Sequence, residues 1–173
     1  MLLALISAAS PAFAQSPANP APQPPKPTMT TFGDWVLTCR KGAGADTGRE
    51  ACEITQTFTA QGQTAPFAQM AVGRISPKAP FNVTVVVPHN VSFPSTVALA
   101  TDEKGSNPMT LNWTRCLATG CFASGQLTDA AIAVWRPLAQ RGRLSFKNAL
   151  GQDVVLPLSF NGFNDAFNSL AKK

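Results

Sequence analysis

Four cysteines carry the most reactive side chains of this sequence: Cys39, Cys52, Cys116 and Cys121. Cysteines form disulfides in exported proteins, hold zinc as thiolates, or act as nucleophiles when one of them is free. The spacings Cys-x12-Cys and Cys-x4-Cys do not resemble the short knuckles of zinc sites, and the chain has only 1 histidine to add. We therefore expect disulfides. Of the three pairings that four cysteines allow, we favour Cys39–Cys52 with Cys116–Cys121, because each of these pairs falls where neighbouring strands would meet.

Enzymatic chemistry would need a base or a nucleophile, for which His89 and the Cys116–Cys121 pair are the candidates. A hydrolase could use His89, but the sequence contains no Gly-x-Ser-x-Gly motif around a serine. A reduced Cys116–Cys121 pair could exchange disulfides, although its spacing differs from the Cys-x-x-Cys of thiol oxidoreductases. We expect no catalytic residue, no metal and no cofactor.

Charged and aromatic residues offer two further kinds of site. Asp34, and Asp102 with Glu103, could act as glycosidase carboxylates, but they are more simply strand-edge and turn residues. The densest basic group could bind phosphate or an acidic sugar, and a solvated surface is its simpler interpretation. Its members are Arg136, Arg141, Arg143 and Lys147.

The tryptophans could line a sugar-binding groove. They lie instead on the apolar faces of alternating or helical patterns, so we expect core packing for them. They are Trp35, Trp113 and Trp135.

The elements that would hold these residues are mostly short strands. Trp35, Leu37 and Cys39 alternate with Asp34, Val36 and Thr38, so one face of a strand would carry an aromatic ring, an aliphatic side chain and a sulfur. Similar patterns predict strands over residues 32–39, 50–59, 67–75, 81–87, 96–101, 109–116, 122–127, 143–147 and 154–160.

Two helices interrupt or follow these strands. Apolar residues at helical spacing predict a short helix capped by Thr128 or Asp129, and a second helix after Gly162 with Asn161 as its candidate cap. Pro157 places the last strand at an edge or a bulge. The predicted fold is mainly β: an antiparallel β-sandwich or barrel-like domain with one short internal helix and a C-terminal helix.

The first residues have the composition of a targeting segment. Residues 1–14 form an apolar run that ends in Ala12-Phe13-Ala14, which is a signal-peptidase cleavage pattern. Residues 15–28 are rich in proline and predict an extended linker. We expect a single disulfide-containing domain over residues 29–173.

The charge of the chain argues against some partners. The formal net charge is +5, and 13% of the residues are charged, so the surface is mildly basic. Weak association with anionic envelope components is expected. No dense Lys/Arg stripe with interleaved aromatics points to nucleic acid. After the signal, no apolar stretch reaches the ~18 residues of a transmembrane segment.

The order of these features resembles the invasion-associated locus B family of exported bacterial proteins. The resemblance covers nearly the whole predicted domain and depends on order and spacing more than on any one motif. It rests on the signal and proline-rich linker, Phe32-Gly-Asp-Trp35 leading to Cys39, the Cys52-Glu-Ile54 run, Trp113-Thr-Arg-Cys116 with Cys121, and the ending Leu156-Pro-Leu-Ser-Phe-Asn-Gly-Phe163 before a final helix.

The resemblance implies a periplasmic or envelope-associated bacterial protein, of a family named for a role in host-cell invasion by some pathogens. It brings no reaction, ligand or catalytic residue. We expect an exported non-enzymatic protein, periplasmic or secreted, that binds a protein, glycan or lipid partner in the envelope or on a host surface. Association with the outer membrane is left open. The alternative is a periplasmic hydrolase or thiol-redox enzyme.

Overall fold

The computed structural model describes residues 26–41, 48, 50–59 and 64–173. The predicted signal peptide, residues 1–14, and most of the predicted linker, residues 15–28, lie outside the described residues. Among the residues that the structure describes, no helix is both long enough and apolar enough to cross a membrane.

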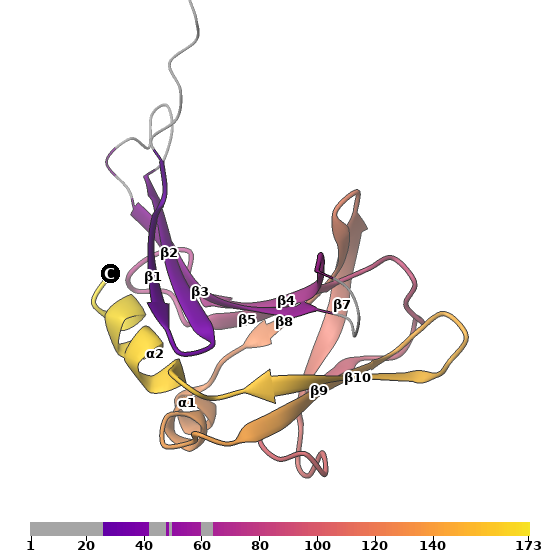
Figure 1. Ribbon diagram of the computed structural model, residues 1–173. Helices are drawn as coiled ribbons and strands as arrows, with labels where there is room; N and C mark the ends of the chain where they lie inside the picture. The colour runs from indigo at the N-terminus through magenta and orange to yellow at the C-terminus, as the bar shows by residue number, and fades with distance from the viewer. Residues whose placement is uncertain (1–25, 42–47, 49, 60–63) are drawn as a thin grey trace, which may run out of the picture.

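The described residues form one antiparallel sheet of 10 strands in the order β1-β2-β3-β4-β5-β8-β7-β6-β9-β10. The sheet curls into a half-barrel in which β9 and β10 return beneath β3, β4 and β5 (Figure 1). The prediction of a mainly antiparallel β domain with two helices is confirmed, and the finer architecture is one curled sheet. The strands are Thr28–Phe32 (β1), Trp35–Lys41 (β2), Glu50–Thr59 (β3), Pro66–Gly73 (β4), Asn82–Val87 (β5), Val97–Ala100 (β6), Met109–Leu117 (β7), Gly120–Gln126 (β8), Arg141–Lys147 (β9) and Asp153–Ser159 (β10).

The first strand was not predicted. β1 pairs with β2 in the register Thr28↔Cys39 to Phe32↔Trp35, so the sheet begins inside the segment that was assigned to the linker. Four of its five residues are exposed, and its sequence Thr-Met-Thr-Thr-Phe has no buried face to reveal it. This segment is a strand because it pairs with β2 across a tight turn at Gly33, and its own sequence does not indicate that pairing.

Alternation along the strands separates an inner face from an outer face. The inner face carries the core, including Trp35, Ile54, Met70 and Leu144, all fully buried. The helix α2, Phe163–Ala171, closes one end of this core, with the Phe163 ring 5.2 Å from that of Trp35. Trp35 and the other inner side chains therefore stabilise the fold by burial of apolar surface.

The helices follow the predicted positions, with one wrong cap. α1 spans Asp129–Trp135, and the side chain of its N-cap Thr128 accepts a hydrogen bond from the Ala131 amide, as predicted. In α2 the N-cap is Gly162 in the left-handed conformation, and no side chain caps the helix, so Asn161 was the wrong choice. The helix begins one residue later than this cap would need, so Asn161 precedes the N-cap, and its carbonyl accepts a hydrogen bond from the Asp34 amide. β10 is an edge strand, as Pro157 indicated.

Candidate functional site

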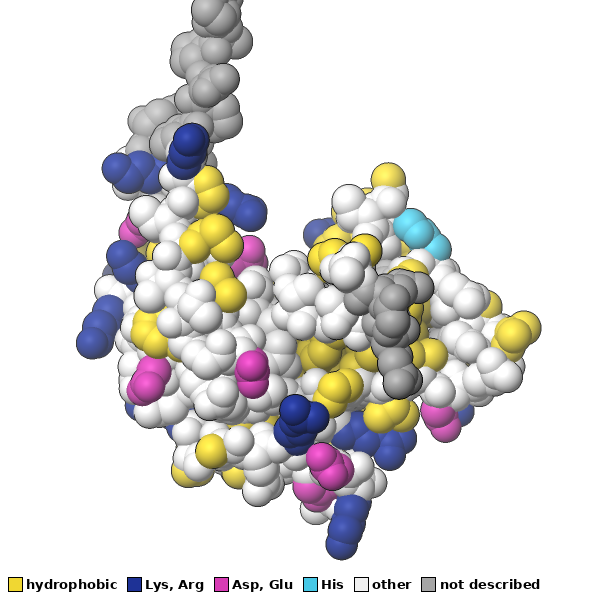
Figure 2. All heavy atoms as spheres, viewed as in Figure 1, with side chains coloured by type: hydrophobic (Ala, Val, Ile, Leu, Met, Phe, Trp, Pro, Cys, Tyr) yellow, Lys and Arg dark blue, Asp and Glu magenta, His cyan; other side chains and the backbone are white. Residues whose placement is uncertain are grey.

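A groove lies in the outer face of the sheet. It has a volume of about 700 Å³ and is lined by strands β2, β3, β4, β5 and β8, the segment after β4, and the end of α2. Figure 2 shows the hollow between the arm formed by β1 and β2 and the upright hairpin of β7 and β8. β1 and β2 rise on one side of this hollow and β7 rises on the other, so the outer face of the sheet is concave here (Figure 1).

The floor of the groove consists of small and polar side chains. Ala71, Thr84 and Val86 point outward from the central strands, opposite to the core residues between them. The Thr84 and Ser124 hydroxyls lie 3.2 Å apart and hydrogen-bond across β5 and β8. At Gly73 an added Cβ would lie 3.3 Å from the Glu53 Cβ, which is closer than ordinary van der Waals contact, so little room exists for a side chain there. Small residues leave this face open.

The walls of the groove carry charges of both signs. Arg74 donates to the Ala171 carbonyl at 3.1 Å, and its guanidinium lies 4.7 Å from the centre of the Phe81 ring. Lys173 and Glu50 form an ion pair of 3.4 Å at the end of α2. Arg40 and Glu53 also line the groove. Such a surface suits a ligand with both polar and apolar parts.

The predicted basic group does not form one site. Arg136 lies at the end of α1, where its Nε and Nη2 donate to the Asn164 and Asn168 amide oxygens of α2 at 2.9 and 2.5 Å. It therefore links the two helices. The other three members are on strand β9, in positions that alternate toward its outer face.

These three residues of β9 have different surroundings. Arg141 is exposed and lines a small cleft with Asp34 and Ser159. The Nε of Arg143 is buried and has no hydrogen-bond partner among the described residues. Lys147 forms an ion pair of 2.9 Å with Asp153. Arg136, Arg143 and Lys147 line neither this small cleft nor the groove.

The cysteines form the two local bonds, Cys39–Cys52 and Cys116–Cys121. Each bond joins residues directly opposite on antiparallel strands, β2 with β3 and β7 with β8. Glu50 lies within 4.8 Å of the Cys39 and Cys52 sulfurs, but the described residues bring no group of four cysteines together. The sulfurs therefore tie strands, and the Cys39–Cys52 bond lies beside the groove.

The residues considered for catalysis make structural contacts. His89 Nε2 donates to the Leu117 carbonyl at 2.6 Å, so it joins the loop after β5 to the tip of the β7–β8 hairpin. The Asp34 carboxylate accepts from the Ser159 hydroxyl at 2.6 Å. The Ser106 amide donates to Asp102 at 3.0 Å and lowers the pKa of that carboxyl.

The tryptophans belong to the core side of the sheet. Trp35 and Trp135 are buried, which confirms the core prediction for these two. Trp113 is partly buried, 6.0 Å from the Phe93 ring and 6.3 Å from that of Phe146. None of the three lines the groove.

The sequence contained one signal for the groove that was not used. Along β3, β4 and β5, the positions between the core residues hold mostly Ala, Gly, Thr, Gln and Asn. A solvated outer face more often carries long charged side chains. This bias toward short side chains indicates an uncovered, indented sheet face.

Comparisons with known proteins agree with the architecture. The chain matches the family model described as invasion associated locus B (IalB) protein over residues 35–171. Its structure is similar to the crystal structure of invasion associated protein B from Bartonella henselae, with a TM-score of 0.68 and 21% sequence identity. The similarity covers 84% of this chain and 95% of the other. No curated protein matches the sequence.

Proposed function

The chain belongs to the invasion-associated locus B family, and from this premise we propose that it is an exported, non-enzymatic bacterial envelope protein that binds a partner in the outer-face groove. The observation that carries the proposal is the groove itself, about 700 Å³ in volume and lined by five strands of the sheet. Concave surfaces with apolar parts and a few placed polar groups are the usual binding sites of proteins.

Export is supported by two features of the chain. The first residues have the composition of a signal peptide, and the domain holds two disulfides, which persist in oxidising compartments. The neighbour from Bartonella henselae is an invasion associated protein, which makes a host-cell surface one source of the partner. The envelope is the other source.

The non-enzymatic part of the proposal rests on how the candidate groups are used. His89 donates its Nε2 proton to a carbonyl, and the cysteines are bonded in pairs across strands. The test is an insulin-reduction assay with the purified protein, with thioredoxin as the positive control. We expect no turnover above buffer. Turnover that disappears in Cys116→Ser would overturn this part.

Filling the groove tests the binding part. Ala71 points into the groove from β4, and Ala133 is an exposed residue of α1 outside it. We expect Ala71→Trp to abolish capture of a partner from envelope extract or host-cell membranes by the exported protein, and Ala133→Trp to leave capture unchanged. If Ala71→Trp fails to fold, Gln69→Trp serves, because Gln69 is exposed on the same strand.

The capture experiments also distinguish binding in the groove from binding by the basic residues of β9. Capture that survives Ala71→Trp but is lost in Arg141→Glu/Arg143→Glu would assign binding to β9 and overturn the groove. Capture from host membranes alone would favour an invasion role, and capture from the envelope alone would favour a role in the bacterium. If neither extract yields a partner that depends on Ala71, the proposal fails.

A further inference from the structure

On the side of the molecule away from α2, one connection contacts the tips of two hairpins (Figure 1). The three loops are the connection of residues 88–96 between β5 and β6, the β7–β8 tip and the β9–β10 tip. His89 reaches the Leu117 carbonyl at 2.6 Å, and the Ser92 amide donates to the Lys147 carbonyl at 3.0 Å. Val91 and Asn148 form a β-bridge. The connection thus holds both tips.

Each of these loops exposes one large apolar side chain. The exposed fractions are 59% for Phe93, 49% for Leu117 and 79% for Leu150. Single exposed hydrophobic residues are common, but here one occurs on every loop of a linked cluster. The three exposed side chains therefore lie on segments that the connection of residues 88–96 links to one another.

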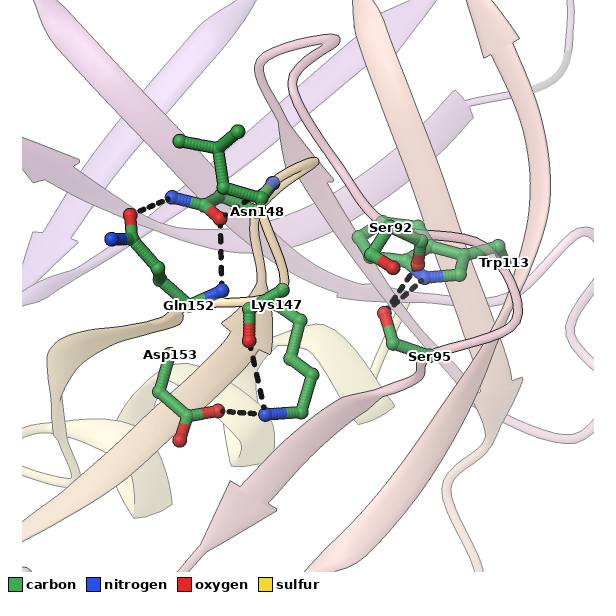
Figure 3. Close-up of polar contacts among 9 residues, drawn as sticks. Ser92, Ser95, Trp113, Lys147, Asn148, Gln152 and Asp153 are labelled. Atoms are coloured by element: carbon green, nitrogen blue, oxygen red, sulfur yellow. Dashed lines mark hydrogen bonds and ion pairs between the residues drawn. The ribbon is translucent and has the colours of Figure 1, made fainter.

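Hydrogen bonds fix the backbone that carries these side chains (Figure 3). The Asn148 Oδ1 accepts from the Leu150 and Gln152 amides, both at 3.0 Å. Ser95 donates to the Ser92 carbonyl and accepts from the Trp113 indole at 3.4 Å. Because the loops are already ordered, binding through their tips would lose little conformational entropy.

Basic residues flank the same end. Arg115 is exposed near Leu117, two positions along β7, and Lys147 stands at the base of the β9–β10 tip. Asp153, which pairs with Lys147, is the acidic residue of this cluster. Together with the net charge of +5, this arrangement attracts anions.

We propose that this end of the protein docks on an anionic lipid surface, with Phe93, Leu117 and Leu150 inserted at the headgroup boundary. Apolar side chains on separate projecting loops, with cations behind them, match the requirements of an interface that is apolar at a depth of ~5–10 Å and negatively charged above it. A protein partner would favour a continuous apolar patch or a groove. The inference rests on the proposed export but uses a surface distinct from the groove, so the two tests fail independently.

Vesicle sedimentation tests the proposal. The exported protein is mixed with vesicles of phosphatidylcholine alone or with an equal amount of phosphatidylglycerol. We expect binding to the mixed vesicles that weakens with salt, and a decrease of about tenfold or more in Leu117→Ser/Leu150→Ser. The matched control is Met29→Ser/Val134→Ser, which removes two apolar side chains that are 66% and 54% exposed and lie outside both the loops and the groove. This control should bind like the parent.

Tryptophan fluorescence reports the orientation. Trp113 lies beside Phe93, whereas Trp35 and Trp135 are buried against Phe163 near α2. Brominated lipids should quench the parent, and Trp113→Phe should lose most of that quenching. Absence of vesicle binding, equal binding by Leu117→Ser/Leu150→Ser, or an equal loss in the control pair would each overturn the proposal. Leu150→Ser alone serves if the double variant does not fold.

Discussion

Gln56 is a buried polar side chain that hydrogen-bonds to the backbone of β10 as a neighbouring strand would. It is 4% exposed, and its amide makes two hydrogen bonds of 3.0 Å with the backbone of Ser159, one to the carbonyl and one from the amide. The Trp35 indole also donates to the Ser159 carbonyl at 3.0 Å. Side chains from β2 and β3 therefore satisfy the backbone groups of Ser159 at the end of β10, which links this edge strand to the opposite side of the curled sheet.

Replacing this amide should destabilise the domain. Gln56→Met keeps the approximate volume but leaves the Ser159 amide without its acceptor, at a cost of about 1–3 kcal/mol in the free energy of unfolding. Urea denaturation measures it. The control Gln69→Met changes an exposed residue of β4 and should shift the midpoint little. Equal midpoints for Gln56→Met and parent would mean that water replaces the amide.

The Lys147–Asp153 pair gives a prediction about pH. The hydrogen bond from Lys147 lowers the pKa of Asp153 below its ordinary value of 3.8, and the charges of Lys147 and Arg143 act in the same direction. A depressed carboxyl pKa stabilises the fold above the unfolded-state pKa, and this contribution is lost as the pH falls through the folded-state pKa. The pair therefore contributes nothing in strong acid.

Lys147→Met should raise the pKa of Asp153 toward 3.8. Carboxyl carbon chemical shifts followed by NMR from neutral to acidic pH would measure it. Asp102 is the internal control, since its pKa is lowered by the Ser106 amide and should not move. An unchanged Asp153 would show that the ion pair does not persist in solution.

At the scale of the elements, the turn into α2 depends on Gly162. Its φ is +83°, and an added Cβ would collide with the Phe32 carbonyl group at the end of β1. Gly151, at the β9–β10 tip, has a φ of +76° with no heavy atom within 4 Å of an added Cβ. Substitution of Gly151 therefore tests backbone strain alone, whereas substitution of Gly162 tests backbone strain together with a steric clash.

Gly151→Ala should cost about 1–2 kcal/mol, which is the penalty of the left-handed conformation for alanine. Gly162→Ala carries the same penalty plus the clash, so we expect a loss larger by about 2 kcal/mol or more. Thermal melts of the two variants compare them directly. Equal losses would indicate that β1 and α2 move apart without cost.

The cross-strand disulfides act on the same scale. The sequence separations are 13 for Cys39–Cys52 and 5 for Cys116–Cys121, which in the chain-entropy model correspond to about 3 and about 2 kcal/mol. Cys52→Ser should lower the melting temperature in oxidising buffer by about 6–12 °C, and Cys116→Ser by less. In reducing buffer Cys52→Ser and the parent should converge. Coincident melting in oxidising buffer would mean that the Cys39–Cys52 bond does not stabilise the fold.

Sequence patterns predicted the elements better than their assembly. Alternating residues identified β3 at its observed bounds, and the helical spacing and Thr128 identified α1, because these signals are local. β1 was missed because pairing with β2 creates it. The curl of the sheet was not predicted, because it depends on contacts between distant parts of the chain. The Gln56–Ser159 contact, for example, joins residues 103 positions apart, and a local sequence pattern cannot indicate such a contact.

The candidate site was the least predictable part for the same reason. The basic group on β9 and α1 was chosen from its density in sequence, yet the structure places Arg136 between helices and pairs Lys147 with Asp153. The groove exists only because the outer faces of five strands curve together, and its floor is made of side chains with no chemistry of their own.

At the scale of the whole molecule, we expect the inner face of the sheet to determine stability and the outer face to determine binding. Phe163 is fully buried on the inner side, with ring centroids 5.2 Å from Trp35 and 5.7 Å from both Trp135 and Phe167. Phe122 is partly buried on the outer side, where it lines the groove and lies 5.4 Å from the Arg115 guanidinium. Stability should depend on the first ring and binding on the second.

Two truncations of the same size test this separation. Phe163→Ala should cost about 3–5 kcal/mol, because it opens a cavity where α2 meets the sheet, whereas Phe122→Ala should cost about 1 kcal/mol or less. Chemical denaturation gives both values, and partner capture by the folded fraction gives the second readout. Phe122→Ala should weaken capture at near-parental stability, while folded Phe163→Ala should retain it. The reverse pattern would mean that the outer face belongs to the structural core and that the partner binds elsewhere.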